Sequence, residues 1–429
     1  MNKHLIKVHS IKLKAKEEEE KKNEFKEDQK HLSQSKIDSN AFKFNSLTKE
    51  RETQITMSLA QFVAVDMRSI HTIEGKGFKN FIETIEPRYK IPTRKTISEK
   101  FIPKIYDESV KLLADQVKEV SNYALTFDYW TSCASKAYLT LTIHYIDKNF
   151  EQRDFVLKTP EVYEEHSGIV TAKVILSILQ SYGLETGDLK KFWVVSDAAR
   201  NMKKTAKVLK VPHIVCFAHI LHNTLTRSSW YNEESNSKLF EKCRNLIKHF
   251  KYSSKGVHNL IEIQKKLEMP QIKLKLDVCT RWNSIYEMIN RLIENRCALL
   301  NLALTDKEVS NLILNQEEWD ILINIRQILS HFKDITDLLC SSRFPSISIL
   351  KPIIKNISEN ILQIKENDTT QIISIKDSIR KDFKVRIEEY KDIQDLLTLS
   401  CLLDPRMKNI YLTSYNERGL KRPSFYKKL

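Results

Sequence analysis

The stretch Leu125–Ser132, LTFDYWTS, decides the fold class because it brings a single carboxylate, Asp128, to the end of a short apolar run. A second stretch, Phe192–Asp197 (FWVVSD), repeats the pattern further along the chain. Two acids at the ends of neighbouring buried strands can hold a hard divalent cation for chemistry on phosphodiesters. Alternatively, each Asp caps the turn or helix that follows its strand.

The residues around the two acids predict a mixed α/β sheet domain over 122–235. Apolar alternation and turn signals indicate the order strand, strand, strand, helix, strand, helix, strand. This order would place Asp128 and Asp197 on neighbouring strands. The expected elements are strands 123–128, 138–146 and 151–158, a helix over 169–182, a strand over 191–196, a helix after Asn201 and a strand over 212–216.

The rest of the chain reads as helix or linker. Residues 11–56 are dominated by Lys, Glu, Gln and Ser, which predicts a disordered charged linker. Residues 57–121 predict a helical region, with one apolar face at Leu59, Phe62, Val63 and Met67 and a longer helix over 103–122. Residues 236–429 predict an all-helical domain, incomplete at its C-terminal end, in which 376–391 forms a surface helix.

Several motifs occur in an order that resembles the hAT superfamily of DNA transposases and the BED-type zinc-finger proteins derived from them. Each motif is weak alone, but together they extend over most of the chain. They are TIEGKGF (72–78), EPRYKIPTRKTI (86–97), FDYWTS (127–132), YLTLTIHYID (138–147), HS (166–167), SDAARNM (196–202), CFAH (216–219), TRWNS (280–284), FPSIS (344–348) and LDPRMK (403–408).

The resemblance implies an RNase H-like catalytic core with an Asp, Asp, Glu triad that a large helical insertion interrupts. Asp128 and Asp197 match the first two acids, which would hold Mg or Mn if the enzyme were active. The family's Ser-Glu-Arg motif, which carries the third acid, does not occur in the sequence. Asp277 and Glu287 are weaker substitutes, and Arg200 could pair with Asp197 and compete with metal. We therefore expect a chain truncated at both ends, whose vestigial acids bind Mg weakly and do not catalyse.

Two further groups of residues resemble DNA-contacting parts of the family. Arg281, Trp282 and Asn283 match an element in which the Trp stacks on an extruded base. The alternative is a buried Trp at the start of the insertion helix. In the region over 57–121, which in the family contributes to DNA binding and dimer contacts, the cations have an equal alternative as solvated residues of a packed helical subdomain. These cations are Lys90, Arg94 and Lys95.

Cysteine and histidine residues suggest two minor sites. His4 and His9, within residues 1–10, resemble the end of a BED-type zinc finger, so Zn is expected only if an upstream finger exists; a chance pair is the alternative. Cys216 and His219 resemble the family's Cys-x-x-His element. On a helix, these two and His222 are spread too widely to chelate one ion without strain, which favours polar supporting roles around the acids.

Composition favours a polyanionic partner. The 429-residue chain has 70 Lys and Arg against 55 Asp and Glu, a net charge of +15, and such a surplus favours DNA through counterion release. Seven scattered Cys indicate a reducing compartment. The sequence contains no apolar run of membrane-spanning length. We expect a nuclear protein, no membrane partner, and a homodimer weakened by the missing C-terminal segment.

Three function classes follow. The first is a transposase-derived nuclear DNA-binding protein without catalysis. The second is a fragment of an active transposase that cleaves and transfers DNA strands with metal. The third, an unrelated RNase H-like nuclease, is disfavoured because the compact domain lacks a third acid.

Overall fold

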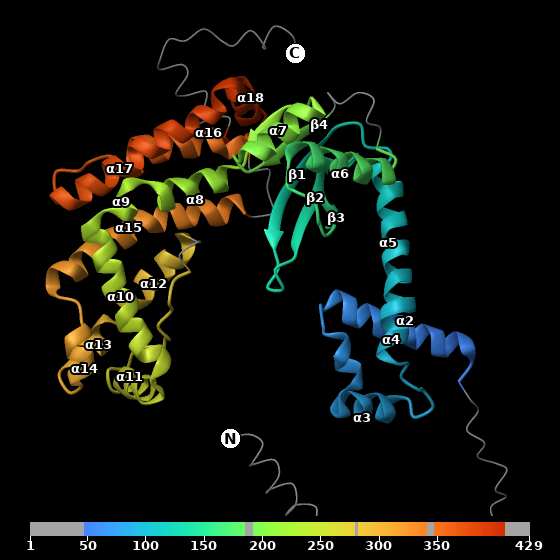
Figure 1. Cartoon of the computed structure of the whole chain (residues 1–429), viewed down its shortest axis with the longest axis horizontal. Helices are drawn as coiled ribbons and strands as arrows, with labels where there is room; N and C mark the ends of the chain where they lie inside the picture. The colour runs from blue at the N-terminus through green and yellow to red at the C-terminus, as the bar shows by residue number, and fades with distance from the viewer. Residues whose placement is uncertain (1–46, 185–191, 279–281, 341–346, 408–429) are drawn as a thin grey trace, which may run out of the picture. The chain divides into compact units, whose positions relative to one another are not determined.

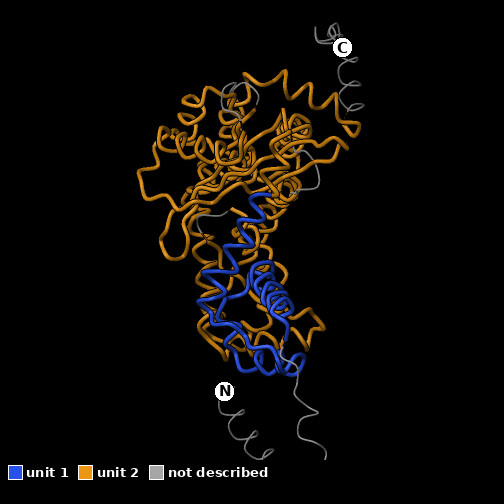
Figure 2. The backbone as a smooth tube through the Cα atoms, turned by 90° about the vertical axis from the view of Figure 1, so that its right-hand side faces the viewer, with its two compact units in different colours: residues 1–111 blue, residues 112–429 orange. Residues whose placement is uncertain are grey.

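The computed structural model describes residues 47–184, 192–278, 282–340 and 347–407. The chain divides into two compact units, residues 1–111 and 112–429, which Figure 2 shows in two colours. The boundary falls within helix α5 (Ile102–Val117). Each unit is described separately below.

The N-terminal unit is helical, as expected, but its first helix starts before residue 57. Helix α2 (Lys49–Val65) begins at Lys49 because the Thr48 hydroxyl caps it by accepting a 3.3 Å hydrogen bond from the Arg51 amide. The expected linker therefore does not reach residue 56. The unit continues with η2 (Ile70–Glu74), α3 (Lys76–Ile85), α4 (Arg94–Thr96) and η3 (Ile97–Phe101).

A small apolar core holds this unit together. Leu59 and Val63 of α2 pack with Ile73 and Ile97 in that core. The predicted apolar face was wrong for Met67, which is 91% exposed because α2 ends at Val65. Phe62 is also partly exposed, and its ring stacks on Phe78 with centroids 6.1 Å apart.

The second unit begins with a five-stranded mixed sheet in the order β3-β2-β1-β4-β5. The antiparallel pairs are β1 with β2 and β2 with β3, and the parallel pairs are β1 with β4 and β4 with β5. The predicted element order is confirmed. The strands are β1 (Tyr123–Thr131), β2 (Ala137–Ile146), β3 (Gln152–Lys158), β4 (Phe192–Ser196) and β5 (His213–Val215).

Helices α6 (Gly168–Ser181) and α7 (Arg200–Leu209) pack against each other beside this sheet (Figure 1). The Thr171 hydroxyl of α6 lies 3.0 Å from the hydroxyl of Tyr129, so α6 lies on the sheet face that carries Tyr129. Because side chains alternate along a strand, Leu125 and Phe127 bury one face of β1, while Asp128 points to the other.

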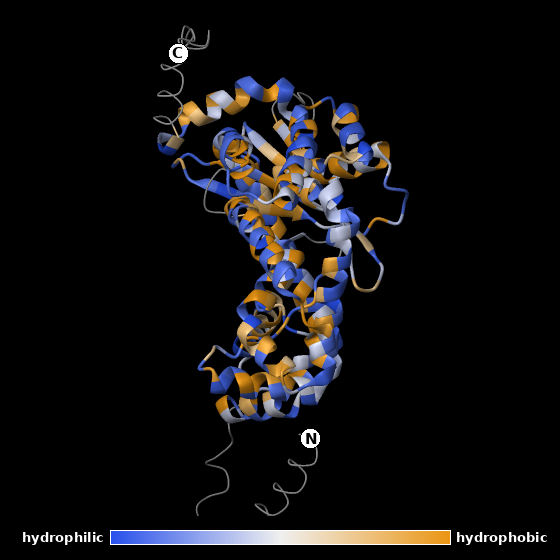
Figure 3. Ribbon diagram, turned by 90° about the vertical axis from the view of Figure 1, so that its left-hand side faces the viewer, coloured by the Kyte–Doolittle hydropathy of each residue, from blue (hydrophilic) through white to orange (hydrophobic). Residues whose placement is uncertain are grey.

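The remainder of the second unit is a helical array whose core continues from Ile214 and Val215 of β5. The ribbons of these helices alternate between hydrophobic and hydrophilic residues, as amphipathic packing requires (Figure 3). The array contains α8 (Phe217–Arg227), α9 (Ser229–Asn232), α10 (Glu234–Tyr252), α11 (Ser254–Lys266), α12 (Trp282–Glu294), α13 (Arg296–Ala303), α14 (Lys307–Leu312), α15 (Gln316–Leu339), α16 (Ile347–Asn356), η5 (Ile357–Ile361), α17 (Thr370–Ile387), η6 (Glu388–Ile393) and α18 (Gln394–Leu403).

The predicted surface helix over 376–391 is present as the second half of α17 and the start of η6, with Lys381, Lys384 and Lys391 exposed, but its inner side is buried more deeply than expected. Ile379, Phe383 and Tyr390 are buried, and the Phe383 and Tyr390 rings pack against Phe217 of α8. Lys376 is also buried, because its Nζ donates a 3.0 Å hydrogen bond to a backbone carbonyl and forms a 2.6 Å ion pair with Asp368. Ion pairing allows a charged residue to face a core. None of the helices in the described ranges is long and apolar enough to span a membrane.

Candidate functional site

The two predicted acids lie in the middle of the sheet, just beyond the point where the pairing of β1 with β4 ends. In the parallel pair, Thr126 is opposite Val195, and Asp128 and Asp197 each follow these partners after one intervening residue. The acids therefore project on the same side of neighbouring chain segments. Asp128 does not end its strand as predicted, because β1 continues to Thr131 alongside β2 alone.

The surroundings of Asp128 raise the pKa of its carboxyl group and so disfavour its ionised form. Its side chain reaches solvent, yet the protein atoms crowded around the carboxyl raise its pKa by partial desolvation. The charge of His219 acts in the opposite direction, and the neighbouring Asp197 raises the pKa of Asp128 further. Asp197 also caps the following turn, because its Oδ1 accepts a 2.9 Å hydrogen bond from the Ala199 amide. Both predicted roles of Asp197, acid neighbour and cap, thus occur together.

His219 of α8 supplies a positive charge beside the acids. Its interaction with Cys216 raises the pKa of His219 to about 9 against the opposing effect of burial, and Asp128 and Asp197 add to the rise. Burial alone would raise the pKa of Cys216, but His219 and the backbone amides at the start of α8 lower it. No regular hydrogen bond reaches the buried Nδ1 of His219 from any described residue. His219 is therefore a charged neighbour of the acid pair, and Cys216 supports the charge of His219.

The His-Ser motif, His166 and Ser167, connects β1 with α6 and α7. The His166 ring stacks on Tyr129 at 4.2 Å, next to Asp128, and the Ser167 side chain caps α6. Asn201 of α7 donates a 3.0 Å hydrogen bond to the carbonyl of His166. Gly168 allows this approach, because a Cβ there would lie 2.7 Å from the Lys204 Cβ.

An aromatic pair on the same face as Asp128, an exposed Trp130 on a half-buried Tyr138, was not predicted. Trp130 is 46% exposed, and its ring stacks on Tyr138 of β2 with centroids 4.8 Å apart. The indole Nε1 donates a 2.9 Å hydrogen bond to Thr140, the residue opposite Asp128 in the β1–β2 register. The alternation of β1 could have indicated this, since Asp128 and Trp130 differ by two positions and so share a face.

The predicted DNA-contacting residues around Trp282 have different surroundings. Trp282 is 4% exposed at the start of α12, which matches the packing alternative. Asn283 has a buried Oδ1 without a hydrogen-bond partner among the described residues. Arg281 lies outside the described residues, as do His4 and His9.

The substitute acids are engaged elsewhere in the helical array. Arg244 forms two hydrogen bonds of 2.9 and 2.7 Å with the buried carboxylate of Asp277, and it also contacts Tyr231. Glu287 lies 3.8 Å from the ammonium of Lys275. Arg200 makes no ion pair with Asp197, so the expected competition between these two residues is absent from the structure.

The cations of the N-terminal unit are mostly solvated. Lys90 is exposed, Arg94 lies 3.9 Å from Glu74, and Lys95 lies 4.0 Å from Glu99. Exposed pairs of this kind contribute little to stability. These side chains remain available to a polyanion but do not form a built site.

The residues around the acids do not fit the two-metal site that the family resemblance implies. Across the described ranges, no group of three or more His, Cys, Asp or Glu residues could hold a metal ion. Asp128 and Asp197 offer two carboxylates, and the nearby His219, whose pKa is raised to about 9, adds a positive charge there. Two carboxylates beside a cation form a weak site for Mg²⁺ or Mn²⁺.

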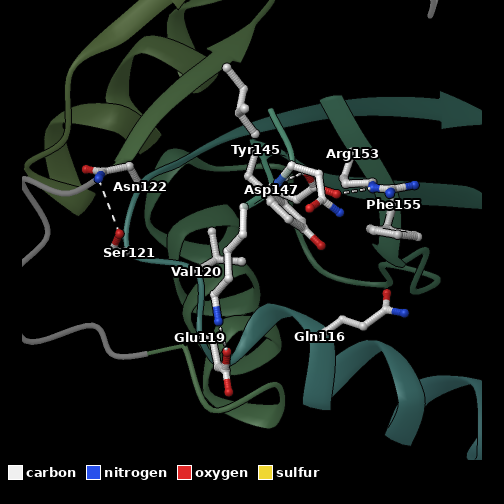
Figure 4. A pocket seen from close by; sticks show the side chains of 12 residues that line it. Gln116, Glu119, Val120, Ser121, Asn122, Tyr145, Asp147, Arg153 and Phe155 are labelled. Atoms are coloured by element: carbon white, nitrogen blue, oxygen red, sulfur yellow. Dashed lines mark hydrogen bonds and ion pairs between the residues drawn. The ribbon is translucent and has the colours of Figure 1, made fainter. Parts of the chain in front are cut away.

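A polar cavity of about 650 Å³ lies at the opposite end of β1 (Figure 4). The end of α5 and the β2–β3 hairpin line it, including Asn122 just before β1. Its charges are already paired, Lys148 with Glu119 at 2.8 Å and Arg153 with Asp147 at 2.8 Å. Because it lies at the other end of β1, the cavity is separate from the acid pair.

Comparison with known proteins defines the class of protein. Residues 126–223 match the family model of the ZBED1 RNase-like domain, and residues 214–328 match that of the ZBED1 RNase-like helical domain. The first match covers the sheet with its acid pair, and the second covers the helical array as far as α15. Both models describe parts of an RNase-like protein with a helical domain.

Individual relatives give the same result. The putative AC transposase of Zea mays is 25% identical over 366 residues, covering 81% of this chain and 44% of the relative. Zinc finger BED domain-containing protein 4 of Homo sapiens is 22% identical over 382 residues, which cover 86% of this chain and 32% of the relative. Zinc finger BED domain-containing protein 6 of Mus musculus is 24% identical over 378 residues, which cover 83% of this chain and 38% of the relative.

These matches show that the chain is similar to AC transposase and to BED zinc-finger proteins, and they support a transposase-derived protein of the hAT and BED group. The chain spans less than half the length of these three relatives.

Proposed function

We propose that this chain is a hAT transposase-derived nuclear protein that binds DNA and does not cut it. The observation that carries the proposal is the Asp128 and Asp197 pair on one side of the sheet, in a chain with a net charge of +15. A stack of the exposed Trp130 on Tyr138 lies on the same face and offers a surface on which a base can stack. The names of the transposase and zinc-finger relatives support the same class.

The ligand count supports binding without cleavage. In-line displacement at a two-metal site requires several carboxylates to fix both ions. Asp128 and Asp197 supply two, while Asp277 and Glu287 are directed to Arg244 and Lys275. The expected state is a protein that binds Mg²⁺ weakly and cleaves no strand.

The finer architecture is part of this proposal. We infer that the sheet domain is RNase H-like, that the helical array is its insertion domain, and that the N-terminal unit contributes DNA and homodimer contacts. The strand order and the two matched family models support the first two points. The basic, solvated side chains Lys90, Arg94 and Lys95 support the third.

DNA binding is tested with random duplexes by fluorescence anisotropy. Affinity should fall steeply as salt rises, because most of the binding free energy comes from counterion release. Salt-independent binding, or no binding at low salt, would contradict the proposal.

The second candidate function is a part of a metal-dependent DNA transposase, which the acid pair and the name of the maize relative favour. A strand-cleavage assay with Mg²⁺ or Mn²⁺ on DNA with terminal inverted repeats separates the two. The first proposal predicts no metal-dependent nicking. Nicking that Asp128→Ala abolishes, with Asp154→Ala as the control acid on β3, would establish the second.

A further inference from the structure

Helix α7 carries all its cations on one side. Arg200, Lys203, Lys204 and Lys207 are separated by three or four residues, so they share a helix face. The opposite side, with Met202, Thr205, Ala206 and Leu209, is buried. The segment from residue 200 to residue 210 contains no Asp or Glu.

Most of these cations have no acidic partner. Lys203 forms an ion pair with Glu389 of η6 at 2.5 Å. Arg200, Lys204 and Lys207 are exposed, and no carboxylate within residues 47–184, 192–278, 282–340 and 347–407 forms an ion pair with them. We call these three residues the α7 basic face.

The positions of these positive charges destabilise helix α7. Like charges separated by three or four residues repel each other on a helix. Cations in the first turn also oppose the helix dipole, and Arg200 is the first residue of α7. A partner that neutralises the face would remove both effects.

Helix α7 is held by contacts on its buried side, and it begins shortly after Asp197 in the sequence. Arg200 follows Asp197 after two intervening residues. Asn201 fixes α7 to the carbonyl of His166, and the Lys204 Cβ packs closely against Gly168 of α6. The backbone of α7 is therefore anchored, and its exposed cations follow Asp197 on a helix whose position is set by α6.

We propose that the α7 basic face binds the phosphate backbone of duplex DNA next to the Asp128 and Asp197 pair. The proposal rests on the proposed DNA-binding function and assigns a site to it. The face extends roughly 10 Å along the helix at about 1.5 Å per residue. Duplex DNA carries one charge per about 1.7 Å of its axis, so several phosphates lie within that length.

The chemistry of the face favours DNA over an acidic protein. Protein interfaces centre on buried aromatic and apolar anchors with a polar rim. The α7 basic face has only cations, with Val208, 42% exposed, as a small apolar neighbour. Charge without apolar anchors is typical of phosphate contacts, which position a duplex without reading its sequence.

The test compares three double variants in duplex binding over a salt series. Lys204→Ala with Lys207→Ala removes two charges and keeps the Cβ that packs on Gly168. Lys204→Arg with Lys207→Arg retains the charge. Lys248→Ala with Lys255→Ala removes two exposed lysines from α10 and α11 as the matched control.

We expect the α7 alanine variant to bind roughly 10-fold or more weakly, with a salt slope smaller by about 1 per lysine removed. The arginine variant and the control variant should bind like the unmodified chain. The melting temperature of the alanine variant should not fall, because the removed charges repel each other.

Distinct outcomes separate this inference from the proposed function. If the unmodified chain does not bind duplex DNA, the proposed function fails. If it binds and the α7 alanine variant matches the control variant, this inference is overturned while DNA binding stands. If polyglutamate binds and loses affinity in the α7 alanine variant while DNA does not, the face belongs to an acidic protein partner and the inference is wrong.

Discussion

Asp128 and Asp197 occupy equivalent positions on β1 and on the segment that follows β4, just beyond the last paired residues Thr126 and Val195. Two carboxylates brought together in this way repel each other unless a cation lies between or beside them. In this chain, the side chain of His219 is the cation beside them. The site therefore combines an acid pair with a positive charge supplied by the protein itself.

The first prediction concerns the charge of His219. Folding raises its pKa from 6.5 to about 9, so the folded state binds the proton more tightly than the unfolded state. This contribution to stability is fully present below pH 6.5 and is lost as the pH rises through about 9. Urea unfolding of the unmodified chain and of His219→Gln over this interval should show a larger loss of stability in the unmodified chain.

Several groups around His219 set this behaviour. Cys216 on α8, Asp128 on β1 and Asp197 after β4 raise its pKa, and burial opposes them. Cys216→Ser should lower the pKa of His219 in an NMR titration. His258→Gln, an exposed histidine on α11, is the control and should leave the pH dependence unchanged. An unchanged His219 titration in Cys216→Ser would contradict the assignment.

The second prediction concerns Trp282. Because its side chain is buried, Trp282→Ala should destabilise the fold by about 3–5 kcal/mol. Thermal unfolding measures this effect. If the variant kept its melting temperature and selectively lost affinity for hairpin DNA, the base-stacking role would be correct instead.

The third prediction concerns Trp130, which lies exposed beside the acids. Trp130→Ala should weaken binding of single-stranded DNA by about 1–3 kcal/mol if one base stacks there. Trp130→Phe keeps an aromatic face and should retain most of the affinity. Equal affinities for all three proteins in anisotropy titrations would show that the Trp130–Tyr138 stack does not contact DNA.

The fourth prediction concerns the contact between α6 and α7. Gly168→Ala places a Cβ 2.7 Å from the Lys204 Cβ and 2.8 Å from the Asn201 carbonyl oxygen, which should cost about 1–3 kcal/mol of stability. Gly77→Ala in α3 is the matched control, since its Cβ meets nothing within 4 Å. A glycine replaced by alanine in an open helix position should be neutral or stabilising. Equal melting temperatures for both variants would contradict the close packing.

The sequence alone determined the elements of the sheet domain. The alternation Leu139, Leu141 and Ile143 predicted β2, and the apolar run before Asp197 predicted β4, each to within a few residues. These signals are local, because the side-chain periods of a strand and a helix follow from backbone geometry. The same signals placed the strands that lead to Asp128 and Asp197 side by side, and the pairing of β1 with β4 confirms this, although Asp197 itself follows the end of β4.

Only the tertiary structure decided which aromatic side chains are exposed and which polar side chains have a partner. Trp282 and Trp130 are both aromatic residues next to polar motifs, yet one is buried in the helical array and the other is exposed beside Asp128. Asp277 pairs with Arg244 of α10, 33 residues earlier in the sequence, and Lys376 is buried in a helix that was predicted to lie at the surface. Burial and ion pairing depend on partners distant in sequence, and no local period encodes those partners.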